Sequence, residues 1–223
     1  MRLTAAIFDV EGTLVDCVRW QLESWRITLS SVGHSLTHAQ LQPFSGMDGE
    51  WMLDQLLPAE SRETKQKLLK AQSSLYQTDF LPRVEPMPGV RQLFEVLKAH
   101  NVKLGIATTC QKQELAHYDE RLRIIDLTDA VACGEMVKHG KPDPELFQKC
   151  LADLKIKDAL DALAVGDTPY DAAAAKQLGM RCAGVLTGGF SAHALLAAGC
   201  DDVFDQVRDI RDLWEGGHLD PIN

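Results

Sequence analysis

The stretch AAIFDVEGTLVD, residues 5–16, decides how the rest of the chain is interpreted. It starts as a short apolar run, which is typical of a buried strand. The run ends in two acids, Asp9 and Glu11, directly before Gly12, which permits a tight turn. We therefore expect a strand over residues 3–9 that presents two carboxylates at its carboxyl end.

After residue 84 the chain alternates short apolar runs with longer amphipathic ones. This rhythm predicts a parallel sheet covered by helices, an α/β fold. The predicted strands are 102–108, 130–133, 161–167, 181–187 and 201–204. The predicted helices are 89–100, 111–123, 143–154, 170–178, 191–198 and 206–214.

Residues 17–82 differ from the rest of the chain, because their pattern predicts consecutive helices and no strands between them. We expect an inserted helical unit in which Gly33 ends the first helix, Thr37 begins the next and residues 58–78 form a long charged helix. The basic residues of 62–70 are interpreted as a solvated helix face. The predicted division is a core of residues 1–16 and 83–223 with a helical domain of residues 17–82.

The composition of the chain limits the kinds of protein it can be. The 223 residues are 45% hydrophobic and 25% charged, which is typical of a soluble globular protein. The first apolar run is too short for a signal peptide or a membrane span. The six cysteines are scattered without a CxxC pair, which is typical of a reducing compartment. We therefore expect a cytoplasmic protein. A net charge of -9 argues against nucleic-acid or anionic-membrane partners.

Polar residues follow several predicted strands, at the edge where open parallel sheets bind ligands. Each alone has an ordinary explanation, such as helix capping. Together, several acids, a lysine and threonines at one edge call for a cation and suggest a site for a divalent metal and a phosphate. The residues are Asp9, Glu11, Thr108, Thr109, Lys141, Asp167 and Asp171.

The chemistry accounts for these residue types. A carboxylate can attack a phosphoryl group and form an aspartyl-phosphate, while Mg²⁺ and a lysine offset the repulsion between anions. A threonine hydroxyl can orient a phosphate oxygen. A second acid is needed to protonate the leaving alkoxide and then to deprotonate water.

Four ordered motifs resemble those of the haloacid dehalogenase superfamily: DVEGTLVD (9–16), LGIATT (104–109), GKPDP (140–144) and VGDTPYD (165–171). PMPGV, residues 86–90, resembles the return from the cap in the phosphoglycolate phosphatase and β-phosphoglucomutase branches. The resemblance covers nearly the whole chain. It implies a Rossmann-like, doubly wound parallel sheet with a helical cap inserted after the first strand.

The resemblance also implies roles for individual residues. Asp9 would be the nucleophile, Thr108 would bind the transferring phosphoryl group and Lys141 would steady the nucleophile. Mg²⁺ would be held by Asp9, Asp167 and the backbone carbonyl of Glu11, with Asp171 nearby or acting through water. The phosphate-binding set would comprise Gly12, Thr108, Thr109 and Lys141.

Glu11 departs from the pattern, because the family usually has aspartate two residues after the nucleophile. One interpretation is drift in a protein that has lost its chemistry. The other is an active acid, as in the enolase-phosphatase branch, which this chain resembles in having Asp-x-Glu-Gly-Thr. The extra methylene moves the carboxyl by about 1.5 Å.

The predicted function is Mg²⁺-dependent hydrolysis of a small phosphorylated metabolite. A phosphomutase and a non-catalytic phosphometabolite-binding protein remain as alternatives, and a monomer and a homodimer are both compatible with the sequence. A phosphonatase is disfavoured, because by the family resemblance it would need a cap lysine to form a Schiff base, and residues 17–60 contain no lysine. A haloacid dehalogenase is disfavoured, because it would not need the metal-binding fourth motif that VGDTPYD resembles. Substrate contacts are expected from the cap, where residues 44–51 form a candidate loop over the site; the candidates are Arg19, Trp20, Met47 and Asp48.

Overall fold

Six parallel strands form the central sheet of the computed structural model, which describes residues 3–215. Their spatial order is β5-β4-β1-β6-β7-β8, so β1 lies between the two halves of the sheet. The strands are β1 Ala5–Phe8, β4 Lys103–Ala107, β5 Ala130–Ala132, β6 Ala162–Gly166, β7 Arg181–Val185 and β8 Asp202–Phe204. This arrangement confirms the predicted α/β, Rossmann-like sheet.

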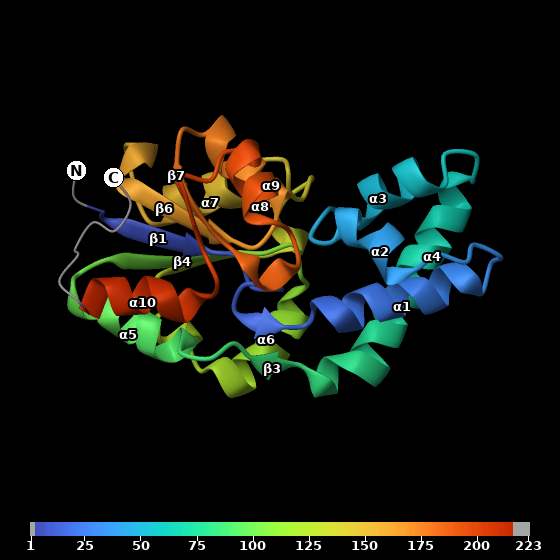
Figure 1. Cartoon of the computed structure of the whole chain (residues 1–223), viewed down its shortest axis with the longest axis horizontal. Coiled ribbons are helices and arrows are strands. Elements are labelled where there is room, and N and C mark those ends of the chain that lie inside the picture. The colour runs from blue at the N-terminus through green and yellow to red at the C-terminus, as the bar shows by residue number, and fades with distance from the viewer. Residues whose placement is uncertain (1–2, 216–223) are drawn as a thin grey trace.

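Helices cover both faces of the sheet (Figure 1). One face carries α5 Val90–Ala99, α6 Lys112–Leu122 and α10 Val207–Glu215. The other carries α7 Glu145–Asp153, α8 Pro169–Gln177 and α9 Ala192–Ala198. Each predicted helix of this part of the chain is present, with ends that lie within two residues of the expected ones.

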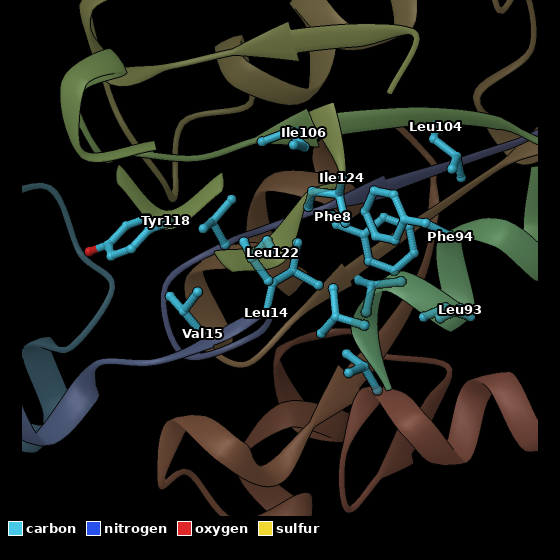
Figure 2. Close-up of a cluster of buried hydrophobic side chains, with 14 of the residues drawn as sticks. Phe8, Leu14, Val15, Leu93, Phe94, Leu104, Ile106, Tyr118, Leu122 and Ile124 are labelled. Atoms are coloured by element: carbon cyan, nitrogen blue, oxygen red, sulfur yellow. The ribbon is translucent and has the colours of Figure 1, made fainter. Parts of the chain in front are cut away.

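The two faces of β1 have separate cores, because successive side chains of a strand point to opposite sides. Ala6 and Phe8 belong to the cluster under α5, whereas Ala5 and Ile7 belong to the cluster under α7. Figure 2 shows part of the first cluster, in which the Phe8 and Phe94 rings lie 4.8 Å apart between centroids. These buried contacts fix the strand whose carboxyl end carries Asp9.

The remaining helices form a lobe beside the sheet, seen at the right of Figure 1 and called here the helical lobe. It consists of α1 Val18–Ser30, α2 His38–Leu41, α3 Gly49–Leu56 and α4 Arg62–Leu75, followed by a π-helical turn over Tyr76–Phe80. A core of leucines and Met52 holds the lobe together. The chain enters and leaves it through two short antiparallel strands, β2 Val15–Asp16 and β3 Glu85–Pro86, which were not predicted.

Two predictions within the helical lobe have different outcomes. Thr37 begins α2 as predicted: its hydroxyl accepts from the backbone N–H of Gln40, and the Gln40 side chain accepts from the backbone N–H of Thr37. Gly33 does not end α1, because Ser31 is the C-cap; Gly33 lies two residues further on, at φ +89°.

Two further observations concern the chain as a whole. Within residues 3–215, no helix is both long and apolar enough to cross a membrane. The six cysteines are buried and free, although the Sγ atoms of Cys182 and Cys200 lie only 3.6 Å apart.

Candidate active site

The register of the sheet brings the polar residues of three strands to one place. Phe8 pairs with Ile106 on one side and with Val165 on the other. Asp9 follows Phe8 directly, so it lies at the carboxyl edge beside the ends of β4 and β6, where Thr108 and Asp167 leave the sheet. The chain builds β4 and β5 on one side of β1 and β6 to β8 on the other, which makes this edge the expected ligand crevice.

Lys141 is the buried cation of the site, with only 1% of its surface exposed. Its Nζ lies 2.5 Å from Asp9 Oδ1 and 2.7 Å from Asp171 Oδ1, and it donates to the Ala107 carbonyl at 2.7 Å. Burial disfavours the ammonium, but the two carboxylates outweigh it and raise the pKa of Lys141. Lys141 therefore stays charged and neutralises part of the acidic cluster.

The cluster still carries more negative than positive charge. Asp9, Asp167 and Asp171 are buried and each offers a carboxylate oxygen within 4.8 Å of the others, against one lysine. Burial raises the pKa of Asp9 to about 6, with Lys141 opposing the shift. Burial and the Asp9 charge also raise the pKa of Asp167 well above its usual value. Such a set is stable when a further cation is bound.

The surroundings of Asp167 fit a hard divalent cation. Its Oδ1 accepts from the Thr13 hydroxyl at 2.8 Å, whereas its buried Oδ2 has no hydrogen-bond partner. A Cβ at either Gly12 or Gly188 would lie well inside contact distance of that oxygen, so glycine at both positions keeps space around it. An unpartnered buried carboxylate oxygen beside open space is what a Mg²⁺ ligand requires.

Asp171 is already engaged on both of its oxygens. Oδ1 faces Lys141, and Oδ2 accepts from the Thr168 hydroxyl at 2.6 Å and from its backbone N–H at 3.1 Å, which begins α8. The structure thus places Asp171 within the acidic cluster as a partner of Lys141. This position suits contact with a metal through water rather than a direct bond.

Glu11 lines the cavity between the sheet edge and the helical lobe. Its Oε1 accepts from the Tyr118 hydroxyl at 2.8 Å. Burial first, and the nearby Glu114 charge second, raise the pKa of Glu11 to about 8. A carboxyl with such a pKa can carry a proton near neutral pH, which is the property of a general acid.

The other predicted phosphate-binding residues lie around the same edge. Thr108 is fully buried, and its hydroxyl accepts from the backbone N–H of Cys110 at 3.2 Å. Thr109 lines the cavity. Gly12 adopts φ +87°, a conformation in which side chains are strained, and its carbonyl accepts from the Thr187 hydroxyl at 2.5 Å.

The cavity has a volume of about 590 Å³ and lies mainly against the helical lobe. Its lining is rich in uncharged hydrogen-bonding side chains: Gln21, Gln66, Gln72, Ser73, Tyr76, Gln77 and Gln111. Among its lining residues, all of which lie in the described part of the chain, Lys70 is the single cation. Lys70 is exposed, as expected for a solvated helix face, and it also borders the cavity.

The four cap candidates separate into two pairs. Met47 and Asp48 line the cavity, but the Asp48 carboxylate also caps α3 by accepting from two backbone N–H groups. Arg19 and Trp20 are not among the cavity-lining residues. Trp20 stacks on Phe80 at 5.8 Å with the Arg19 guanidinium over its ring, at the base of the lobe.

Residues 44–51, expected as a loop over the site, combine a turn with the start of α3. The backbone N–H of Asp48 donates to the Lys141 carbonyl at 3.3 Å, and Gln42 Nε2 donates to the Gly188 carbonyl at 2.7 Å. The Tyr170 hydroxyl donates to the Pro43 carbonyl. Residues 42–48 therefore bridge the helical lobe and the loops of the site.

Some residues of the site were not singled out from the sequence. Thr13 is one of them, although its place in DVEGTLVD, four residues after Asp9, was a usable signal. Tyr76, Tyr118 and Glu114 gave no such signal, because nothing in the sequence places them near Glu11.

Comparison with known proteins agrees with this geometry. Residues 6–185 match the haloacid dehalogenase-like hydrolase family. The chain is 30% identical to a phosphorylated carbohydrates phosphatase of Thermotoga maritima, over 88% of this chain and 92% of the relative. It is 27% identical to a β-phosphoglucomutase of Bacillus subtilis, over 82% and 83% of the two chains.

A solved structure of a hydrolase from Pseudomonas syringae superposes with a TM-score of 0.88, at 26% identity, and covers 96% of this chain and 98% of the other. The likeness thus extends over the sheet and the helical lobe together. With the family match over residues 6–185, it shows that the chain belongs to the haloacid dehalogenase-like hydrolase family and is an enzyme.

Proposed function

We propose that this enzyme is a Mg²⁺-dependent phosphoric monoester hydrolase that acts through a phosphorylated Asp9. The observation that carries the proposal is the arrangement around Asp9: a buried carboxylate fixed by Lys141, beside an unpartnered Asp167 oxygen, with Glu11 on the cavity side. Two carboxyls with different surroundings suit two different chemical tasks.

In the first step an Asp9 oxygen attacks phosphorus while the ester P–O bond breaks. Glu11 gives its proton to the leaving alkoxide. In the second step water attacks the phosphorus of the aspartyl-phosphate, Glu11 takes a proton from that water, and phosphate leaves as Asp9 is regenerated. Lys141 holds Asp9 Oδ1 and offsets charge through both steps.

Asp9 and Asp167 are the residues that would hold Mg²⁺ directly, with the Glu11 backbone carbonyl, and Asp171 would act through water. When bound, the ion supplies positive charge that offsets repulsion between the phosphate and the carboxylates. Thr13 orients Asp167 by its hydroxyl, at 2.8 Å. Such outer contacts matter because they fix the direction of a ligand oxygen.

Thr108, Thr109, Gly12 and Lys141 form the phosphate-binding set of the proposal. Gly12 and Thr109 lie where backbone or small side chains can approach a phosphate closely, and Lys141 contributes charge. The net charge of -9 and the acidic cluster would otherwise repel an anionic substrate, so the charge of Lys141 together with that of a bound cation is required.

The organic part of the substrate is proposed to be small, uncharged and hydroxylated. Glutamine and serine side chains dominate the polar lining of the cavity, and they pair with hydroxyl groups. The lining has one cation, Lys70, and three acids, Glu11, Asp48 and Glu114, and this charge balance does not favour a second anionic group on the substrate. The Thermotoga maritima relative, which is named for phosphorylated carbohydrates, supports the same class.

Residues 17–82 are proposed to act as a cap over this site. Several hydrogen bonds already join the helical lobe to the loops at the sheet edge, including the one from Gln42 to Gly188. A cap that closes over the phosphate would exclude bulk water and strengthen the electrostatic contacts inside.

A phosphomutase is the second candidate, favoured by the 27% identity to a β-phosphoglucomutase. It would use the same Asp9 chemistry but would return the phosphoryl group to a sugar hydroxyl. The cavity of about 590 Å³ has room for a sugar. The two reactions differ in product: inorganic phosphate in one case and an isomeric sugar phosphate in the other.

The test is a set of phosphate monoesters assayed with Mg²⁺ and with EDTA: p-nitrophenyl phosphate, a neutral hexose phosphate and phosphoglycolate. We expect Mg²⁺-dependent release of phosphate, with the hexose phosphate preferred over phosphoglycolate. Asp9→Asn should lower the rate by more than about a thousandfold. Asp153→Asn, an exposed acid on α7, is the matched control and should retain full rate.

Three outcomes would count against the proposal. Activity that survived Asp9→Asn would overturn the nucleophile. Full activity in Glu11→Gln would overturn the acid, whereas Glu11→Asp should keep part of the rate. Tight binding of a phosphorylated ligand without any turnover in Mg²⁺ would favour the binding-protein alternative instead.

A further inference from the structure

A chain of three polar groups runs from the helical lobe to Glu11. The hydroxyl of Tyr76 lies 2.6 Å from the hydroxyl of Tyr118, and the hydroxyl of Tyr118 donates to Glu11 Oε1 at 2.8 Å. Each tyrosine is only 2% exposed. In Figure 2 the Tyr118 ring lies at the edge of the core cluster, with its oxygen directed away from the cluster.

The direction of these hydrogen bonds follows from the number of protons available. Each phenol has a single O–H proton. Because Tyr118 gives its proton to Glu11, Tyr76 must be the donor between the two hydroxyls. Burial, as the main cause, raises the pKa of both phenols far above their ordinary value, so both remain donors. The Tyr118 hydroxyl therefore holds one oxygen of the Glu11 carboxyl, and the Tyr76 hydroxyl in turn holds Tyr118.

The chain suits glutamate at this position rather than aspartate. The shorter side chain would place the carboxyl about 1.5 Å further back. An oxygen now 2.8 Å from the Tyr118 hydroxyl would then lie outside hydrogen-bond distance. The length of Glu11 and the place of Tyr118 are thus matched features of this chain.

We propose that Tyr118, supported by Tyr76, is a positioning residue that directs the Glu11 carboxyl toward the leaving group. The inference rests on the proposed role of Glu11 as the acid. Neither tyrosine exchanges a proton with substrate in this account; both act by fixing where the carboxyl lies. Misplacing a reacting group by about 1 Å can cost on the order of a hundredfold in rate.

The two tyrosines also lie on different parts of the molecule. Tyr118 belongs to α6, which packs on the sheet, whereas Tyr76 begins the π-helical turn that ends the helical lobe. The hydroxyl contact between them therefore connects the lobe to the acid. The Glu11 carboxyl is fully held only when the lobe occupies the position seen here.

The test is a double-mutant cycle between Tyr118→Phe and Glu11→Asp, with kcat and KM measured on p-nitrophenyl phosphate in Mg²⁺. Tyr118→Phe keeps the ring and removes the hydroxyl, and we expect kcat to fall roughly ten- to a hundredfold with KM changed by less than about twofold. In the Glu11→Asp background, where the hydroxyl no longer reaches the carboxyl, Tyr118→Phe should cause no further loss. Equal losses in both backgrounds would overturn the inference, because they would indicate a general structural effect.

Tyr170→Phe is the matched control. It removes the third tyrosine hydroxyl of the chain, which also joins the helical lobe to the core but donates to the Pro43 carbonyl. Its effect, whatever its size, should be the same in both backgrounds. Tyr76→Phe should resemble Tyr118→Phe with a smaller loss, since it removes the outer donor only.

A crystal structure of the Tyr118→Phe variant provides a readout that does not depend on turnover. We expect the Glu11 carboxyl to leave the position beside residue 118, and an unmoved carboxyl would refute the positioning role. If the wild-type protein were inactive while Glu11 was displaced in the Tyr118→Phe variant, the proposed function would be contradicted and the positioning role would still hold.

Discussion

Lys141→Met tests whether the acidic cluster depends on its single buried lysine. Methionine nearly matches the length of the lysine stem but cannot pair with Asp9 or Asp171, whose oxygens lie 2.5 and 2.7 Å from Nζ. The variant leaves those two acids and Asp167 within 4.8 Å of one another without a counter-charge. Removing one partner of a buried ion pair is strongly destabilising for this reason.

The expected loss is about 3–5 kcal/mol in the free energy of unfolding. For a chain of this size each kcal/mol lowers the melting temperature by about 2–4 °C, so the drop should be about 6–20 °C. The loss should be largest in EDTA, because a bound divalent cation would offset part of the repulsion. Added Mg²⁺ should therefore recover a larger share of stability in the variant than in the wild-type protein.

Thermal and urea unfolding, each with EDTA and with Mg²⁺, provide the measurement. Lys149→Met is the matched control, because Lys149 pairs with Asp153 on the exposed face of α7 and should contribute less than about 1 kcal/mol. Adding Asp171→Asn to Lys141→Met should restore part of the loss by removing one repelling charge. A loss below about 1 kcal/mol in Lys141→Met would refute the view that this lysine balances the cluster.

Further predictions address the metal, the core and the helical lobe. Thr13→Val removes the hydroxyl that donates to Asp167, and Mg²⁺ affinity measured by calorimetry should fall about 10–100-fold; unchanged affinity would contradict the orienting role. Phe94→Ala removes a fully buried ring from the core and should lower the free energy of unfolding by about 3–5 kcal/mol in urea. Hydrogen bonding from Arg26, chiefly, lowers the pKa of Glu23 to about 2, below its ordinary 4.5. The Glu23 carboxylate therefore stabilises the fold above about pH 4.5, and this contribution is lost as the pH falls toward 2. Because the pair is partly exposed, the contribution to the free energy of unfolding should be less than about 1 kcal/mol. Glu23→Gln should remove that part of the acid dependence in urea unfolding at pH 3 and pH 6, and an unchanged dependence would contradict it.

The sheet and much of the site could be predicted from the sequence because both depend on local patterns. Alternating apolar and amphipathic segments identify strands and helices, and polar residues that follow strands converge once the strands are parallel. Asp9, Thr108 and Asp167 were found by this reasoning. Glu11 was recognised as unusual by comparison with the family motif, which usually has aspartate at this position.

Other features depend on contacts between distant residues and could not be predicted. Tyr118 lies 107 positions from Glu11, and no periodic pattern links them. Strands β2 and β3 have two residues each, which is too short for an alternation signal.

The most direct test of the account is to trap the phosphorylated enzyme. Glu11→Gln should slow attack by water on the aspartyl-phosphate, so the intermediate should accumulate when this variant is mixed with p-nitrophenyl phosphate and Mg²⁺ and then quenched in acid. Mass spectrometry should find one added phosphoryl group, on the peptide that contains Asp9, and none in Asp9→Asn. Turnover of the wild-type enzyme with no phosphoryl group on Asp9 in the quenched variant, or with the group on another residue, would contradict the mechanism.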